Sequence, residues 1–267
     1  MTNYRDIVVD ASPRADLHRT LEFARDMTKM FSAKLSAASY AWPRTSIGDV
    51  LVHNTFRDQE QTILMERALK ASRSVFDEVF AKNEETGWQS GIGEPTLAMQ
   101  ARLLTADLLI TDSAEEEACV LANPAYVALG SGAPVLRLGR APRNPGFSNV
   151  VVAWKDSPHA CRAVHDALPI LKRADSVAVI GVGDELAAER LEAVTAHLQL
   201  HAVKARPWHI SDTTGDVCLS LLKEAQHEGA QLIVTGAYSR GPLTERVLGG
   251  VTASMLKNAE ISWFMSH

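Results

Sequence analysis

The side chains most able to do chemistry lie in a glycine-rich stretch that follows an apolar run at residues 231–235. Its candidate ligand-contacting residues are glycines, hydroxyl residues and one arginine: Gly236, Ser239, Arg240, Gly249, Gly250 and Thr252. A glycine at the carboxyl end of a strand lets the backbone approach a ligand, and a helix that begins nearby directs unpaired N–H groups at an anion. The planar guanidinium of Arg240 also suits phosphate oxygens. The pattern indicates a phosphate site; the alternative is a tight turn with Arg240 as a solvated loop residue.

The elements that would position this stretch alternate between short apolar runs and segments of helical period, which is typical of βαβ units and an α/β fold. In the second half we predict strands at 149–154, 176–182, 203–210, 231–235 and 261–265, and helices at 157–173, 185–199, 212–228 and 243–258. Ser157, followed by a proline, predicts a helix N-cap, and Asp212 predicts another. In the first half we predict a helix at 59–83, a strand near Trp88, a helix opening at 94–95 and a closing strand at 134–138.

The order of elements is the same in both halves because the chain repeats itself. Residues 6–15 and 151–160 each read as an apolar strand that reaches Ser-Pro, and residues 106–112 are echoed by 230–236. Two echoes in the same order indicate a duplication. The length of 267 residues agrees with two domains.

The two copies differ in length between their landmarks, and the polar stretch 43–58 is the expected insertion in the first copy. Two prolines and a glycine within 142–146 interrupt the pattern between the copies. We therefore predict one domain over 1–143 and a second over 144–267.

Several of these segments resemble the universal stress protein family, specifically its tandem members, and the resemblance covers nearly the whole chain. They are the strand-Ser-Pro-helix opening of each half, the segment 236–252, the closing strand 133–136 and the terminal residues 264–267. The resemblance implies a stress-response protein with two doubly wound, Rossmann-like domains, each built on a five-stranded, mainly parallel sheet. It also implies pairing through the last strand and, as in many members, ATP or another adenine nucleotide at the carboxyl end of the sheet, with Mg²⁺.

The family's nucleotide-binding pattern is Gly, two residues, Gly, nine residues, and then Gly followed by Ser or Thr. Gly236 and Gly249 match it, whereas Ser239 replaces the middle glycine and Gly250 replaces the hydroxyl residue. The loss of one hydroxyl costs about 0.5–1.5 kcal/mol, and the backbone N–H of Gly250 and the hydroxyl of Thr252 are available to a phosphate. Ser239 carries a steric cost if its position requires a positive φ.

The family also places an aspartate at the end of the first strand, against the nucleoside. Asp10 holds that position in the first half, and in the second half we assign it to Lys155. Asp156 follows one residue later, and because side chains alternate along a strand, its carboxylate need not point the same way. Lys155 would attract an anion or serve only as a loop lysine. The first half replaces the glycine loop with four carboxylates, which would repel phosphate: Asp112, Glu115, Glu116 and Glu117. The resemblance therefore implies a nucleotide site in the second half alone.

Other function classes find little support. A net charge of −5 and a pI near 6.0 disfavour nucleic acid as a main partner. The three cysteines form no CxxC pair, and among the nine histidines only His197 and His201 share helical spacing, so we predict no metal. Neither a nucleophile elbow nor a Walker lysine is present, so we predict no catalytic residue and at most slow ATP hydrolysis. With no signal peptide or membrane-spanning run, we expect a cytoplasmic protein without a membrane partner.

Two function classes remain open. The first is a nucleotide-responsive binding module, in which the ligand orders residues 238–243 and changes what an unknown protein partner meets there. The second is a structural or adaptor protein whose two domains form an intrachain pseudo-dimer with decayed sites, or a binder of another small anionic or lipid-like ligand. Two chains could pair further into a homodimer. The segment 260–264, which contains Trp263, lacks the closing-strand proline that the first half keeps as Pro134, so we expect pairing through this edge to differ.

Overall fold

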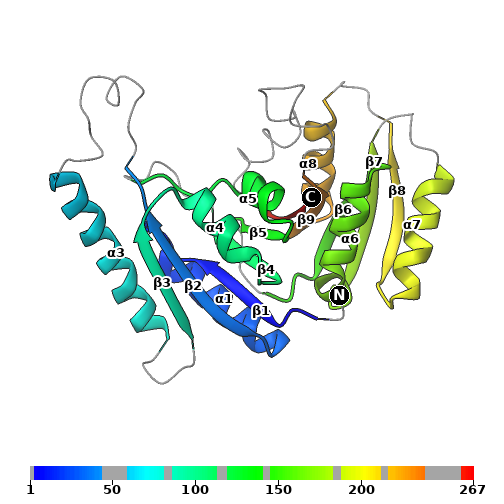
Figure 1. Ribbon diagram of the computed structural model, residues 1–267. Helices are drawn as coiled ribbons and strands as arrows, with labels where there is room; N and C mark the ends of the chain where they lie inside the picture. Colours follow the sequence, from blue (N-terminus) through cyan, green and yellow to red (C-terminus); the bar gives the residue numbers. More distant parts are fainter. Residues whose placement is uncertain are drawn as a thin grey trace.

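The computed structural model describes residues 3–43, 59–80, 86–112, 119–140, 145–182, 188–211, 216–237 and 260–267. Within these ranges the strands form one ten-stranded sheet in the order β3-β2-β1-β4-β5-β10-β9-β6-β7-β8. Figure 1 shows the two halves side by side, with α3 at the outer end of the first half and α7 at the outer end of the second. The predicted α/β class and the doubly wound arrangement of each half are confirmed.

The first half contains these elements: β1 (Asp6–Asp10), α1 (Leu17–Phe31), β2 (Lys34–Ala41), α3 (Gln59–Val79), β3 (Gly87–Ile92), α4 (Pro95–Leu103), β4 (Leu108–Asp112), α5 (Pro124–Ser131) and β5 (Val135–Leu138). Capping residues fix where the shorter helices begin. The Glu94 carboxylate accepts hydrogen bonds from two N–H groups at the start of α4, and the Asn123 side chain does the same for α5. Each cap is followed by a proline, whose missing N–H costs nothing at that position.

The second half contains β6 (Asn149–Ala153), α6 (Pro158–Leu171), β7 (Ser176–Val182), α7 (Ala188–Leu200), β8 (Ala205–Ile210), α8 (Val217–His227), β9 (Leu232–Gly236) and β10 (Ser262–Ser266). The predicted N-cap Ser157 is confirmed, because its hydroxyl accepts a hydrogen bond from Ala160 N at 3.2 Å. Helix α8 begins later than predicted, and its cap is Asp216, whose carboxylate accepts from Leu219 N at 3.0 Å. Asp212, the helix predicted at 243–258 and the domain boundary predicted after residue 143 lie outside the described residues.

The two halves meet where the last strand of each pairs with the other. Strand β10 runs antiparallel to β5, with Trp263 opposite Arg137, and parallel to β9. The side chain of Trp263 also donates its indole N–H to Thr235 Oγ1 at 2.7 Å, in a buried position. The two halves are therefore joined within one chain through β5 and β10, as the predicted intrachain pseudo-dimer requires. The expected difference from the family's edge pairing stays a prediction.

Two apolar layers cover the sheet, and each layer includes residues from both halves. Helices α1, α3, α6 and α7 contribute to one layer, and α4, α5 and α8 contribute to the other. Contacts between the halves reinforce the first layer: Tyr4 donates its hydroxyl to Asp166 O at 2.7 Å, and the rings of Phe23 and Phe147 lie 5.9 Å apart. No helix among the described residues is long and apolar enough to cross a membrane.

Candidate functional site

Each half-sheet has one point where the direction of strand crossover reverses. In the first half this point lies between β1 and β4, and in the second half it lies between β6 and β9. In open α/β sheets, ligands bind outside the carboxyl ends of the two strands that flank such a point. The fold therefore defines two candidate crevices, one in each half, and the side chains at each decide what it can hold.

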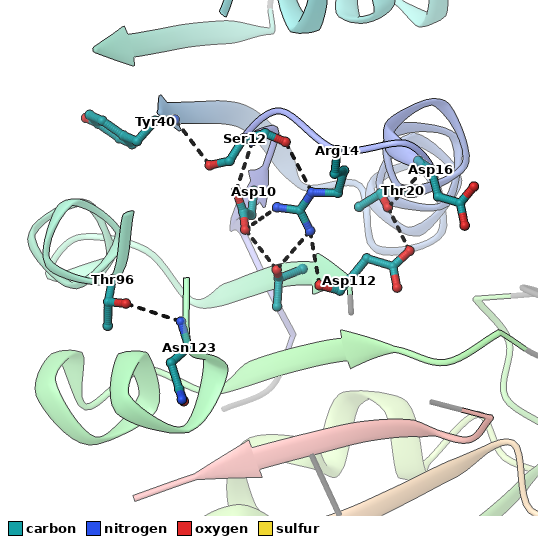
Figure 2. A network of polar contacts seen from close by, with 10 residues as sticks. Asp10, Ser12, Arg14, Asp16, Thr20, Tyr40, Thr96, Asp112 and Asn123 are labelled. Carbon is teal, nitrogen blue, oxygen red and sulfur yellow. Dashed lines mark hydrogen bonds and ion pairs between the residues drawn. The ribbon is translucent and has the colours of Figure 1, made fainter. Parts of the chain in front are cut away.

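In the first half, the crevice holds a buried ion pair between Asp10, at the end of β1, and Arg14, in the loop before α1. Both side chains are completely buried. The Asp10 carboxylate also accepts hydrogen bonds from Thr111 Oγ1 at 2.9 Å and from Ser12 N at 3.0 Å. Figure 2 shows these groups converging between the ends of β1 and β4.

The Arg14 guanidinium is held on several sides. It donates to Ser12 O at 3.2 Å and to Asp112 O at 3.1 Å. Burial alone raises the pKa of Asp10, but the charge of Arg14 and the hydrogen bonds from Ser12 and Arg14 outweigh burial and leave that pKa below its usual value. Asp10 is thus ionised at neutral pH, and the carboxylate that the family resemblance assigns to the nucleoside is engaged with the chain's own arginine.

Asp112 stands at the end of β4, at the position that the internal repeat pairs with Gly236. Its carboxylate accepts a hydrogen bond from Thr20 Oγ1 at 3.1 Å and lies 3.4 Å from Arg19 Nη2, both on α1. This side chain is therefore turned toward α1 and occupied there, as Figure 2 shows for Thr20. The remaining acidic residues of the predicted repelling loop, 115–117, lie outside the described residues.

In the second half, the matching crevice contains smaller residues. Gly236 ends β9, and a Cβ added there would lie 2.7 Å from Ala160 N and 2.8 Å from His159 Cβ. The first turn of α6 therefore packs directly against the end of β9, and this close approach is enough to require glycine. Close packing against α6 alone therefore explains a glycine at position 236, whatever ligand the crevice takes.

The strand register corrects one assignment made from the repeat. Val9 pairs with Ile110 in the first half, and Val152 pairs with Val234 in the second. The position equivalent to Asp10 is therefore Ala153, and the assignment to Lys155 is wrong by two residues. The reason is the connecting loop, which runs over residues 11–16 before α1 but only over 154–157 before α6.

Lys155 and Asp156 both lie exposed in that shorter loop. The Asp156 carboxylate accepts the indole N–H of Trp154 at 2.8 Å and pairs with Arg190 Nε, on α7, at 2.9 Å. Within the described residues Lys155 makes no hydrogen bond or ion pair. The other predicted site residues lie outside the described residues: Ser239, Arg240, Gly249, Gly250 and Thr252.

Sequence reasoning missed two features of these crevices. Arg14 was not predicted as a site residue, although its spacing of four residues from Asp10 has no counterpart beside Ala153 and could have drawn attention to it. His159 was also missed; its ring stacks on that of His267, with ring centroids 4.2 Å apart. The sequence signal that could have indicated His159 is its position directly after the N-cap Ser157 and Pro158.

No protein-family model matches the sequence, and no curated protein matches it. Solved structures do match its fold. A universal stress protein from Archaeoglobus fulgidus DSM 4304 has a TM-score of 0.73 at 16% identity, over 99% of this chain and 97% of that one. A protein of unknown function from Pseudomonas aeruginosa PAO1 has a TM-score of 0.63 at 14% identity, over 98% of this chain and 92% of that one. The fold is therefore that of universal stress proteins in tandem arrangement, as the sequence resemblance implied.

Proposed function

We propose that the protein is a nucleotide-responsive binding module of the stress response, and that its C-terminal half binds ATP or another adenine nucleotide. The contrast between the two crevices supports this proposal. In the first half, an ion pair fills the space between the ends of β1 and β4. In the second half, Ala153 and Gly236 take the positions of Asp10 and Asp112, and no ion pair among the described residues joins the ends of β6 and β9.

The phosphates are assigned to the glycine-rich segment that begins at Gly236. On the family pattern this includes Ser239, Arg240, Gly249, Gly250 and Thr252, with Mg²⁺ as counterion. Lys155 and Asp156 are not equivalent to Asp10, but they lie in the loop after Ala153 and are proposed near the nucleoside on that ground. Ala153 offers no carboxylate at the position of Asp10. A hydrogen bond to a charged group contributes about 1.5–3 kcal/mol, so we expect weaker binding than in a crevice that keeps this carboxylate for its ligand. Hydrolysis is expected to be slow at most.

The test is calorimetric titration of the purified chain with ATP, with and without Mg²⁺, after its denatured supernatant has been checked for carried-over nucleotide. We expect saturable binding at one site per chain, weakened by Gly249→Ala. Gly236→Ala is unsuitable because its Cβ would meet the backbone of α6. Gly93→Ala is the matched control, since a Cβ there has no atom within 4 Å. Both variants must show the circular dichroism of the parent.

A specific observation favours the second candidate, a structural or adaptor protein with decayed sites. Among the described residues, neither crevice offers a free carboxylate at the position of Asp10, because Asp10 is paired with Arg14 and its counterpart is Ala153. On this reading, the pseudo-dimer joined by β5 and β10 presents its surface to a protein partner. An absence of binding up to millimolar ATP, with no carried-over nucleotide, would reject the first candidate. Native mass spectrometry of the purified chain would then separate an adaptor from a carrier of another anionic or lipid-like ligand.

A further inference from the structure

Two histidines meet beside the second crevice, where β9 ends. His159 is the second residue of α6, and His267 directly follows β10. Their rings are stacked, with centroids 4.2 Å apart and an interplanar angle of 19°. Gly236 packs against His159, so the pair lies next to the end of β9.

Hydrogen bonding orients one ring of the pair. His267 Nδ1 lies 2.9 Å from the carbonyl oxygen of Ala237. A carbonyl oxygen only accepts, so Nδ1 of His267 carries the proton and donates it. The other nitrogen, Nε2, is then the one left to interact elsewhere. Among the residues that the structure describes, neither the ring of His159 nor Nε2 of His267 has a hydrogen-bond partner.

The electrostatic setting of the pair favours a neutral His159 when no ligand is present. Burial, and secondly the proximity of His267, lower the pKa of His159 below its usual value. The charged groups on the surrounding described elements are Arg162 and Asp166, which lie 3.7 Å apart on α6, and Lys155 and Asp156 in the loop before it. Strands β9 and β10 contribute no charged residue. An anion placed against the rings would therefore meet a neutral His159, which gains charge once a proton is added.

We propose that His159 and His267 form a phosphate-binding pair that takes up a proton when the anion binds. The phosphate is either the phosphoryl end of a nucleotide or free inorganic phosphate or pyrophosphate. Binding of a nucleotide phosphate by this pair rests on the proposed function. Binding of free phosphate or pyrophosphate does not, because it is argued only from His159, His267, Gly236 and Ala237. An imidazolium N–H bonded to a phosphate oxygen is a charge-assisted hydrogen bond, and the negative charge also relieves the repulsion between two protonated rings.

The direction of the pH effect follows from linkage. In the ligand-free protein the neutral form of His159 is favoured, so stability falls on acidification from its unfolded pKa near 6.5 toward the lower folded pKa. A bound anion favours the protonated form and raises the same pKa. Binding therefore strengthens on acidification, by up to about tenfold per pH unit for each proton taken up.

The experiment titrates the whole chain with pyrophosphate, ATP and adenosine at pH 6.0, 6.5, 7.0 and 7.5. Proton uptake is read from calorimetry in buffers of different ionisation enthalpy. The test variant is His159→Gln, which keeps a polar side chain that cannot be protonated, and His267→Gln is the second. The control is His165→Gln, an exposed histidine of the same helix whose ring faces His197 at 5.6 Å. Titration of the phosphates themselves is common to all variants and cancels in the comparison.

We expect pyrophosphate and ATP to bind more tightly at lower pH with uptake of up to one proton, and His159→Gln to remove this dependence while His165→Gln keeps it. An unchanged pH dependence in both pair variants would overturn the inference and leave nucleotide binding intact. Pyrophosphate binding that depends on His159, without any binding of ATP, would keep the phosphate pair and reject the nucleotide proposal. No binding of either phosphate compound would reject both.

Discussion

The two crevices occupy the same place in two copies of one fold, yet they hold different chemistry. The first is filled from within, because Arg14 pairs with Asp10 and both side chains are completely buried. The second has Ala153 at the position of Asp10 and a glycine at the position of Asp112. A duplicated domain can therefore keep its sheet order while the side chains at equivalent positions of its crevices diverge.

The largest effect is expected from removing the cation that fills the first crevice. Arg14→Met leaves the Asp10 carboxylate buried without its ion-pair partner, so the free energy of unfolding should fall by about 3–5 kcal/mol. Urea denaturation followed by circular dichroism measures this change.

The matched control is Arg73→Met, because Arg73 also pairs with an aspartate four residues away, Asp77, at 2.8 Å, but both side chains are exposed. It should cost well under about 1 kcal/mol. Equal losses of unfolding free energy in the two variants would mean that the buried ion pair stabilises the protein no more than an exposed one.

The acid limb of the stability curve gives a second view of the same pair. The folded pKa of Asp10 is lowered, so its contribution is fully present above the unfolded pKa near 3.8 and is lost as pH falls through the folded value. In Arg14→Met the carboxylate loses the ion pair that holds it ionised, so the destabilisation relative to the parent should shrink as pH falls below about 5. Denaturation midpoints from pH 7 to pH 3 test this, and a difference that grows in acid would contradict the assignment.

A change in the second crevice should sharpen the comparison by restoring the missing carboxylate. Ala153→Asp places an acid at the position equivalent to Asp10, and the residue four positions later is Ser157 where the first half has Arg14. If the proposed nucleotide site exists, ATP binding should strengthen by about 1.5–3 kcal/mol. Lys155→Asp is the competing variant, because the sequence repeat points to that residue. If only Lys155→Asp tightened ATP binding, residue 155 and not residue 153 would be the position that contacts the nucleoside.

How far the sequence could be read depended on the kind of signal. The Ser157 cap and the alternation of strands and helices followed from local patterns, and the structure confirms them. The alignment of Asp10 with Lys155 was wrong because the Ser-Pro dipeptide lies two residues after Asp10 but four residues after Ala153. Comparing the two halves of one chain does not show where an alignment gap should be placed. The Asp10 and Arg14 pair was missed because both residues also suit a solvated turn, and burial depends on packing across the sheet. The glycine segment beyond Ala237 stays a prediction.

The smallest of these effects concerns the seam, the paired strands β5 and β10 that join the two halves. Trp263→Phe keeps an aromatic ring between β5 and β9 but removes the indole N–H that Thr235 Oγ1 accepts at 2.7 Å. Leaving a buried hydroxyl without this donor should cost about 1–2 kcal/mol in unfolding free energy. Thr235→Val removes the acceptor, so the double variant should cost less than the sum of the two single changes. Additive losses would mean that the ring's packing, and not its hydrogen bond, stabilises the seam.

Because Thr235 directly precedes Gly236, the same three variants should also be titrated with ATP, which would show whether the seam and the second crevice are coupled.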